Sequence, residues 1–346
     1  MKSLMNFIIK IWELLKSDPQ TKIAKYIFFG GLGLKGIGTL VYQYKKENVE
    51  HIFTFSDGID YLGYALIIIG LALFIHRYST MKKNAITLAY GIGIKNMDIH
   101  TPIKAIPRYE QFDCIKINLK EIDSYNKDQV IRNYNFNKEL LSDRTLNKNS
   151  QKVYVGALGS FPYLFLIGSL FRNAYSNIII LDYDRFNSNK SEWYKLPVFN
   201  DKKEKLTHKL MYHDISIEER IKELNDNDSN EVGIALSYTF NINKNAIPKY
   251  LQNSILFLQH SYGTGHDKLS NEEVQKELLK ELSTYISLLW SNHNKVHLFV
   301  SAQSSICINI GKIYMDNAHG TVVLHNYDNE SKTYNWSIDF NKGLIS

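Results

Sequence analysis

Two stretches of the chain share one pattern of hydrophobic and polar positions: an apolar strand, a turn of small residues, a helix and a second apolar strand. The first is Val153–Tyr183 and the second is Val296–Tyr327. An offset of 143 residues places Gly168 on Gly311, and one inserted residue then aligns the second strands at an offset of 144. Because alternating strands and helices build mainly parallel sheets, the repeat predicts a duplicated α/β domain with two Rossmann-like units.

Other segments add elements to this core. Glu231–Phe240 is typical of an apolar strand, Asn271–Trp290 of a long amphipathic helix, and Tyr334–Phe340 of a further strand. Cys114–Ile122 alternates like a strand, whereas Asn126–Ser150 is polar and predicts mostly surface. Ligands of parallel sheets bind at the carboxyl ends of the strands. That rule selects five loops: residues 159–162, 182–186, 237–240, 301–305 and 326–328.

The N-terminal third has a different pattern. Residues 1–16 predict an amphipathic helix, and the apolar segments 23–44 and 59–78 approach the roughly 20 residues that a membrane-spanning helix needs. The alternative for both segments is a buried helix of a globular domain. Lys and Arg near the span ends place both chain ends in the cytoplasm. The predicted organisation is a membrane segment at 1–83, a connector that begins the domain at 84–150, and the duplicated core at 151–346.

The first predicted span contains a glycine motif and a charge. Gly31, Gly33 and Gly36 match G-x-G-x-x-G, but the apolar pattern continues beyond them. We therefore interpret the glycines as positions of close helix–helix approach, not as a dinucleotide-binding turn. Lys35 lies in the middle of the span, where it either marks an aqueous or functional path or extends its amine to the membrane surface.

Composition narrows the function. The net charge of +6 comes from Lys and Arg spread along the chain, which favours a solvated surface over a groove for long nucleic acids. The two cysteines, Cys114 and Cys307, exclude a disulfide framework and indicate a reducing compartment. His208 and His213 are five residues apart and do not share a helix face, so we predict no metal site and no cofactor. No catalytic residue is indicated.

The candidate chemistry is that of ligand binding. Helix N-termini bind phosphate through free N–H groups, and aromatic side chains stack on bases; the alternatives are plain N-capping and core packing. The candidate ligand-binding residues are Ser160, Phe161, Pro162, Tyr183, Arg185, Trp193, Tyr238, Thr239, Ser301, Gln303, Ser304 and Ser305.

These residues resemble a known family. VHLFVSAQSSICINIGKIYMDNAHGTVVLHNYD (296–328), followed by Tyr334–Phe340, is similar to the end of SAVED domains, and VYVGALGSFPYLFLIGSLF (153–171) and EVGIALSYTF (231–240) are similar to their earlier strands. The resemblance covers about residues 100–346. It implies two fused CARF-like Rossmann units that bind a cyclic oligonucleotide, with Ser160–Pro162 and Ser301–Ser305 as the ligand turns. Gln303 and Ser304 stand where the family often has Ala or Pro.

The resemblance also implies a biological role. Two spans before a SAVED domain look like the transmembrane effectors of bacterial CBASS anti-phage systems. We accordingly expect that this chain is not an enzyme. There a CD-NTase makes a cyclic di- or trinucleotide, the SAVED domain binds it and oligomerises, and the spans disrupt the inner membrane to cause abortive infection. The alternatives are a membrane-tethered enzyme that degrades cyclic oligonucleotides and a passive nucleotide sensor that relays to a partner protein.

Overall fold

The chain forms two compact units. The smaller comprises Met1–Ile86 and Ile106–Cys114, and the larger comprises Thr87–Ala105 and Ile115–Ser346. The computed structural model describes residues 23–34, 57–83, 85–94, 99–111, 114–119, 123–144, 150–172, 177–184, 192–198, 209–212, 216–227, 229–265, 271–314 and 320–345. Residues 1–16, Lys35, Gly36 and Arg185, which figured in the predictions, lie outside these ranges.

The smaller unit is mainly helical where it is described. It contains a helix over residues 23–34, the long helix α3 (Asp57–Lys83) and the short helix α4 (Arg108–Gln111). A Cβ atom on Gly31 would lie 2.7 Å from the carbonyl oxygen of Gly63, so Gly31 allows the two longer helices to approach closely. A Cβ atom on Gly33 would meet nothing within 4 Å.

The prediction of two membrane spans is wrong, and so is the prediction of a multi-pass protein of the inner membrane with both ends in the cytoplasm. In the part of the chain that the structure describes, no helix combines the length and the apolar character needed to cross a bilayer. The described helix over residues 23–34 is about 18 Å long, and the uncharged stretch of α3 from Tyr61 to Ile75 is about 22 Å long. The hydrocarbon core of a bilayer is about 30 Å thick.

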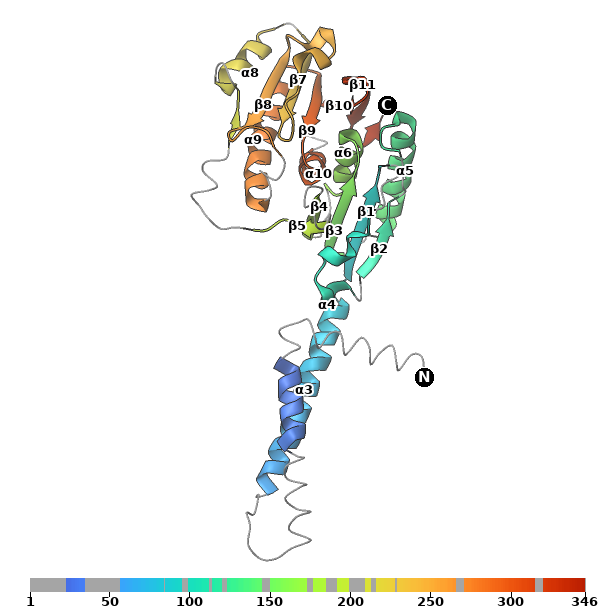
Figure 1. Ribbon diagram of the computed structural model, residues 1–346, viewed down its shortest axis with the longest axis vertical. Coiled ribbons are helices and arrows are strands. Elements are labelled where there is room, and N and C mark those ends of the chain that lie inside the picture. The colour runs from blue at the N-terminus through green and yellow to red at the C-terminus, as the bar shows by residue number, and fades with distance from the viewer. Residues whose placement is uncertain are drawn as a thin grey trace, which may run out of the picture. The chain divides into compact units, whose positions relative to one another are not determined.

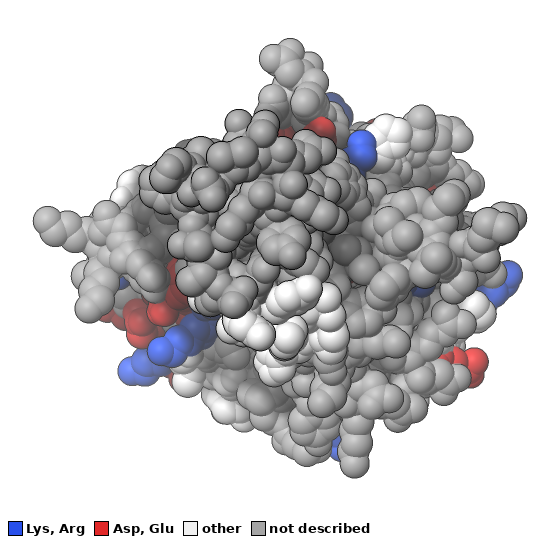
Figure 2. Space-filling model, turned by 90° about the horizontal axis from the view of Figure 1, so that it is seen from below, with Lys and Arg blue, Asp and Glu red and all other residues white. Residues whose placement is uncertain are grey.

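The described helices of the smaller unit expose many large apolar side chains. These are Ile23, Tyr26, Phe29, Leu32, Tyr61, Leu62, Tyr64, Ile68, Ile69, Leu71, Leu73 and Ile75. Figure 2 views the molecule from below, and the described residues in the middle of the view are uncharged.

The larger unit contains two sheets with the same strand order. The first has the order β2-β1-β3-β4-β5, and the second, β12-β11-β10-β9-β7-β8-β6, contains the equivalent run β8-β7-β9-β10-β11. The strands are β1 (Ala85–Ile92), β2 (Cys114–Asn118), β3 (Ser150–Leu158), β4 (Asn177–Asp184), β5 (Glu192–Lys195), β6 (Leu210–Met211), β7 (Glu231–Ser237), β8 (Ile255–His260), β9 (Lys295–Ser301), β10 (Thr321–Asp328), β11 (Thr333–Asn341) and β12 (Leu344–Ile345).

Strand pairing confirms the predicted duplication and extends it. In the first sheet β3 is parallel to β4, which pairs antiparallel with β5. In the second sheet β9 is parallel to β10, which pairs antiparallel with β11. Together with the shared strand order, this means that each copy has five strands, three more than the two strands of the repeated strand–helix–strand pattern.

The helices cover the sheets. They are α5 (Lys127–Arg144), α6 (Phe161–Leu170), α8 (Ile217–Asn225), α9 (Glu272–Trp290) and α10 (Ser304–Ile313), with short 3-10 turns η1 (Pro102–Ala105), η2 (Lys244–Ala246) and η3 (Lys249–Leu251). The long amphipathic helix predicted from the sequence is confirmed as α9. The expectation of a surface segment at 126–150 missed α5, because its buried residues Val130, Tyr134 and Leu141 are diluted by Asn and Lys.

Helices α6 and α10 lie side by side between the two sheets (Figure 1). Their contact requires two glycines. A Cβ atom on Gly168 of α6 would overlap the carbonyl oxygen of Ile308, and one on Gly311 of α10 would overlap that of Phe165. The two glycines are equivalent in the duplication, so the contact is reciprocal. Buried side chains from both sheets and both helices therefore form one core.

Replacing either Gly168 or Gly311 by Ala should lower the free energy of unfolding by about 3 kcal/mol, because a methyl group against a rigid backbone carbonyl forces the helices apart. The double variant should lose less than the sum of the single losses, since the first methyl group already separates the helices that the second would separate. Urea unfolding of the full chain measures all three values.

Gly33→Ala is the matched control, because its methyl group enters open space on a helix and removes a glycine from it. It should leave stability unchanged or raise it by up to about 1 kcal/mol. Equal losses in the control and in the two core variants would show that the α6–α10 contact has no special role.

Candidate functional site

A cavity of about 240 Å³ opens at the carboxyl ends of strands from both sheets, and we call it the shared cavity. All five loops selected from the sequence contribute lining residues to it. The lining residues are Tyr125, Gly159, Ser160, Phe161, Leu164, Asp182, Tyr183, Tyr194, Thr239, Phe240, Val300, Ser301, Ala302, Gln303, Ser304, Cys307, Asn326, Tyr327 and Asn329.

The lining reflects the duplication. Most of these residues occur as equivalent pairs, one from each copy of the strand–helix–strand unit. At the offset of 143 the pairs are Gly159 and Ala302, Ser160 and Gln303, Phe161 and Ser304, and Leu164 and Cys307; at 144 they are Asp182 and Asn326, and Tyr183 and Tyr327. The shared cavity is therefore surrounded by two copies of one structural unit that differ in their side chains.

Two helix N-termini face the shared cavity. Ser160 and Gln303 are the N-cap residues of α6 and α10, and neither side chain makes a capping hydrogen bond. The Ser160 hydroxyl instead donates to the carbonyl oxygen of Ser124, and the Ser160 N–H donates to the Ser124 hydroxyl over 2.9 Å. The first N–H groups of a helix lack partners within the helix and give its N-terminus a partial positive charge. The N-termini of α6 and α10 thus each present N–H groups and a partial positive charge to the cavity.

Ser301 ties the ends of β7 and β9 together. Its hydroxyl shares a 2.9 Å hydrogen bond with the Thr239 hydroxyl and accepts another from the Phe240 N–H over 3.0 Å. Its carbonyl oxygen accepts hydrogen bonds from the N–H groups of Tyr238 and Thr239. This side of the cavity is consequently held by four hydrogen bonds to one residue.

A buried polar chain lies behind the α10 N-terminus. The Ser305 hydroxyl donates to Asp182 Oδ2 over 2.8 Å and accepts from Gln275 Nε2 over 3.0 Å. The Tyr183 N–H donates to Asp182 Oδ1 over 2.9 Å. Ser305 thus positions the carboxylate of Asp182 and does not itself line the cavity. Burial, with the charge of Asp182, raises the pKa of the Cys307 thiol, which therefore stays protonated at neutral pH.

Two aromatic pairs occupy equivalent places beside the cavity. The rings of Tyr183 and Trp193 are 5.3 Å apart between centroids, and so are those of Tyr327 and Tyr334. In each pair the residues face one another across antiparallel strands. Trp193 is further held by a 2.8 Å hydrogen bond from its indole N–H to the carbonyl oxygen of His100. Tyr183 and Tyr327 are thus each supported by a second ring.

The structure brings seven of the predicted site residues to the shared cavity: Ser160, Phe161, Tyr183, Thr239, Ser301, Gln303 and Ser304. Pro162, Trp193, Tyr238 and Ser305 lie behind this lining. Tyr238 is almost fully buried, and burial raises the pKa of its hydroxyl.

Sequence reasoning did not single out Asp182, Asn326 and Tyr327, although it selected their loops. The alignment of Tyr183 with Tyr327 was a signal that could have found the third, because equivalent strand ends meet at one site.

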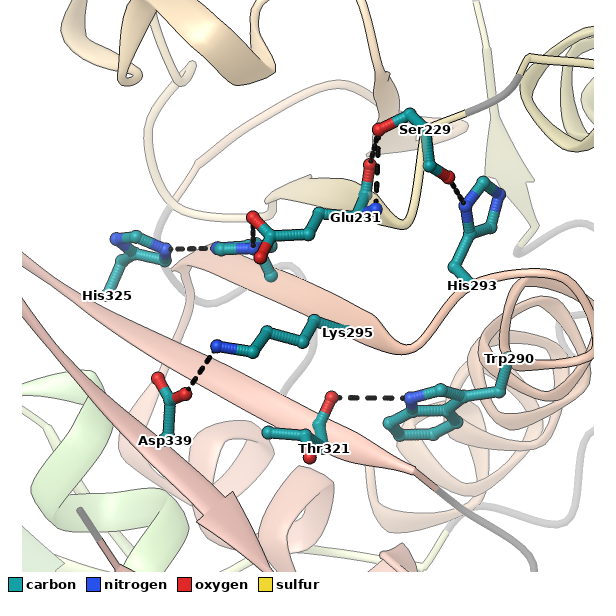
Figure 3. Close-up of polar contacts among 9 residues, drawn as sticks. Ser229, Glu231, Trp290, His293, Lys295, Thr321, His325 and Asp339 are labelled. Atoms are coloured by element: carbon teal, nitrogen blue, oxygen red, sulfur yellow. Dashed lines mark hydrogen bonds and ion pairs between the residues drawn. The ribbon is translucent and has the colours of Figure 1, made fainter.

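A second polar cluster lies on the face of the seven-stranded sheet opposite its helices (Figure 3). His297 Nε2 is 3.1 Å from Glu231 Oε2, and His297 Nδ1 is 2.9 Å from His325 Nε2. The His325 ring stacks on Phe299 at 4.1 Å, and Lys295 forms an ion pair with Asp339 at 2.8 Å nearby.

Burial sets the charge of these imidazoles. It lowers the pKa of His325 to about 3, with the neighbouring His297 acting in the same direction. Burial also lowers the pKa of His297, against the opposing effect of Glu231. Both rings are therefore neutral near pH 7 and act as a hydrogen-bonded part of the sheet. Among the described residues, no group of three or more His, Cys, Asp and Glu is placed to hold a metal ion.

A comparison with protein-family models gives a match to this chain. The model described as "SMODS-associated and fused to various effectors sensor domain" (SAVED) matches residues 136–340, which is more than half of the 346-residue chain. A comparison with curated proteins gave no match.

Solved structures that match part of this chain include three of an Acinetobacter baumannii Cap4 SAVED/CARF-domain containing receptor. The first is with the cyclic trinucleotide 3'3'3'-cAAA, the second is with 2'3'3'-cAAA, and the third names the receptor without a ligand. Identities are 11%, 11% and 12%, TM-scores are 0.46, 0.47 and 0.44, and the matches cover 80%, 80% and 82% of this chain. They cover 59%, 58% and 58% of the Cap4 chains, so this chain spans about three fifths of their length.

Replacing His325 by Phe should flatten the dependence of stability on pH. The pKa of His325 is about 3 in the folded chain and about 6.5 in the unfolded chain, so the unfolded chain binds the proton first as the pH falls. The stability that His325 contributes is present above pH 6.5 and is lost toward pH 3; at pH 5 the loss is about 2 kcal/mol. Urea unfolding at pH 8, 6 and 5 measures it, and an unchanged slope in the variant would contradict it.

Proposed function

Because the chain belongs to the SAVED family of sensor domains, we propose that it is a receptor for a cyclic oligonucleotide, which binds in the shared cavity. The observation that carries the proposal is the paired lining of that cavity. Two equivalent helix N-termini and two equivalent tyrosines surround one space. A ligand with alternating phosphates and bases has the matching internal repetition.

The phosphates bind at the N-termini of α6 and α10. Free N–H groups and the partial positive charge of a helix start favour an anion there. Among the described lining residues there is no Lys or Arg, so this attraction comes from the backbone of two helices. Arg185, three residues beyond Asp182 in the chain, remains a predicted ligand contact.

The bases bind against the tyrosines. Tyr327 is 39% exposed, and Tyr183 is half-buried with Trp193 behind it. Aromatic side chains at such positions offer a flat surface to a base, and each stacked base is worth about 1–3 kcal/mol.

The size of the cavity fits a small cyclic ligand better than a long nucleic acid. Sites for small molecules commonly enclose roughly 300–1,000 Å³, and the shared cavity of about 240 Å³ is slightly smaller. A cyclic di- or trinucleotide therefore fills it and extends over the rim, where Phe240 and Tyr125 are exposed. No further cofactor is part of this proposal.

The ligand comes from a CD-NTase in a CBASS anti-phage system, and its binding leads copies of the receptor to associate. The family description, a sensor domain fused to various effectors, supports a chain that senses a nucleotide and passes the signal on. Membrane disruption was inferred from two membrane spans and is not part of this proposal.

The chain acts as a receptor and not as an enzyme. Cys307 is the one thiol in the described lining of the cavity, and its raised pKa keeps it protonated and therefore a poor nucleophile. The carboxylate of Asp182 already accepts hydrogen bonds from Ser305 and Tyr183, which suits a structural anion better than a general base.

A binding screen of the full chain tests the proposal. Cyclic di- and trinucleotides are added one at a time, and a ligand that binds only the folded chain raises the melting temperature. Linear trinucleotides of the same sequence are the control, and mass spectrometry of each mixture detects cleavage. A raised melting temperature with intact ligand supports the receptor. Linear products support the degrading enzyme, and no shift with any cyclic ligand refutes the proposal.

Replacing Tyr183 or Tyr327 by Ala should weaken binding of the ligand found in that screen by about 10- to 100-fold each, through the loss of one stacked base. Isothermal titration calorimetry measures the dissociation constants. Tyr250→Ala is the matched control, because Tyr250 is 66% exposed and does not line the cavity. Equal effects at all three positions would exclude a specific stacking role.

A further inference from the structure

The shared cavity has two equivalent polar residues that differ in chemistry. Asp182 on β4 and Asn326 on β10 correspond at the offset of 144, and both line the cavity. Only 3% of Asp182 and 1% of Asn326 is exposed. The two copies thus contribute one carboxylate and one amide to the cavity. We call the part of the lining formed by Asp182 and Asn326 the floor.

The Asp182 side is satisfied within the protein. Each of its carboxylate oxygens accepts a hydrogen bond, Oδ2 from the Ser305 hydroxyl and Oδ1 from the Tyr183 N–H. The hydroxyl of Ser305 is itself held by Gln275. This half of the floor needs no ligand to complete it.

The Asn326 side is not satisfied. Its Nδ2 donates to Asn335 Oδ1 over 3.1 Å, but among the described residues Oδ1 has no hydrogen-bond partner. The duplication supplies the reason. Ser305, which donates to Asp182, corresponds to Pro162 in the other copy, and proline has neither a hydroxyl nor an N–H to donate. A buried oxygen without a partner is uncommon in folded proteins and calls for an explanation.

A second unpartnered acceptor lies in the same lining. Gln303 Oε1 is buried and has no hydrogen-bond partner among the described residues. Gln303 is also the N-cap residue of α10, and its side chain does not cap the helix. The shared cavity therefore contains two buried amide oxygens, Asn326 Oδ1 and Gln303 Oε1, that could each accept a hydrogen bond from a ligand.

The ligand group that meets Asn326 must carry such a donor. Phosphates at neutral pH are acceptors only, and the charge of Asp182 repels them from the floor. The helix N-termini offer them a better place. A base stacked on Tyr327 would lie beside Asn326, because the two residues are consecutive on β10 and both line the cavity. The exocyclic amines of adenine and cytosine are donors, whereas the oxygens at the same positions of hypoxanthine and uracil are acceptors.

We propose that Asn326 is a specificity-determining residue that accepts a hydrogen bond from the exocyclic amine of one base of the ligand. The proposal rests on the cyclic oligonucleotide receptor proposed above. In this proposal the carboxylate of Asp182 is hydrogen-bonded within the protein, whereas the amide oxygen of Asn326 is available to the ligand. The receptor therefore distinguishes bases through a hydrogen bond to Asn326.

Matched pairs of cyclic trinucleotides test this inference. The full chain is titrated with cyclic triadenylate against cyclic triinosinate, and with cyclic tricytidylate against cyclic triuridylate, so that each pair exchanges an amine for an oxygen. At least one amine-bearing ring should bind about tenfold or more tightly than its partner. A 2'-deoxy form of the preferred ring tests the other donor, the ribose hydroxyl. If the 2'-deoxy ring binds about tenfold more weakly while the exchange of amine for oxygen has no effect, the assignment to the base is overturned.

Two variants locate the effect. Asn326→Leu removes the acceptor and should bring the ratio of the two affinities close to one. Asn326→Asp keeps an acceptor oxygen and should keep the ratio, even where the added charge weakens both ligands. Asn341→Leu is the matched control: Asn341 also has a buried oxygen without a partner among the described residues, but it does not line the cavity. Its ratio should equal that of the unchanged chain.

The ratio separates recognition from stability, because a variant that merely loosens the fold weakens both members of a pair equally. Should Asn326→Leu keep the preference of the unchanged chain, or should that chain bind both members of each pair equally well, Asn326 does not read the base while the receptor proposal stands. Binding of no cyclic nucleotide at all would overturn both.

Discussion

The contact between α6 and α10 is the constraint on which the rest of the larger unit depends. Gly168 and Gly311 each place a bare Cα against a backbone carbonyl of the other helix, so neither position has room for a side chain. This close approach puts the two helices into one core between the sheets and directs both N-termini to one cavity. Thicker packing at the crossing would separate the two ends, and two half-sites would replace a single site.

The shared cavity shows how a duplicated unit becomes a specific site. The backbone is repeated, with equivalent helix starts and strand ends, and this provides two similar places for an anion and a base. The side chains then differ. Ser305 satisfies Asp182, whereas Pro162 leaves Asn326 with an oxygen that has no partner among the described residues. Repetition thus supplies general affinity for a repetitive ligand, and divergence at the floor supplies discrimination.

The sequence predicted more of the core than of the N-terminal third. The repeated apolar strands and Gly168 with Gly311 led to the duplication, because buried strands and close helix contacts leave strong patterns. The helix α5 was missed since Val130, Tyr134 and Leu141 are scattered among polar residues. The prediction of two membrane spans was wrong because it relied on the apolar composition of two segments. A segment can be rich in apolar residues without forming an uncharged helix about 30 Å long, and no described helix has that length and character.

By itself, the sequence determined the α/β class, the duplication and the five loops that meet at the cavity, since strand order and the carboxyl-end rule follow from local pattern. Only the tertiary structure decided which side chains line the cavity and which lie behind it. Ser305 and Gln303 are two residues apart in one turn, yet Ser305 binds Asp182 from another sheet while Gln303 faces the cavity. Such roles depend on hydrogen bonds between residues more than 100 positions apart, which no local pattern records.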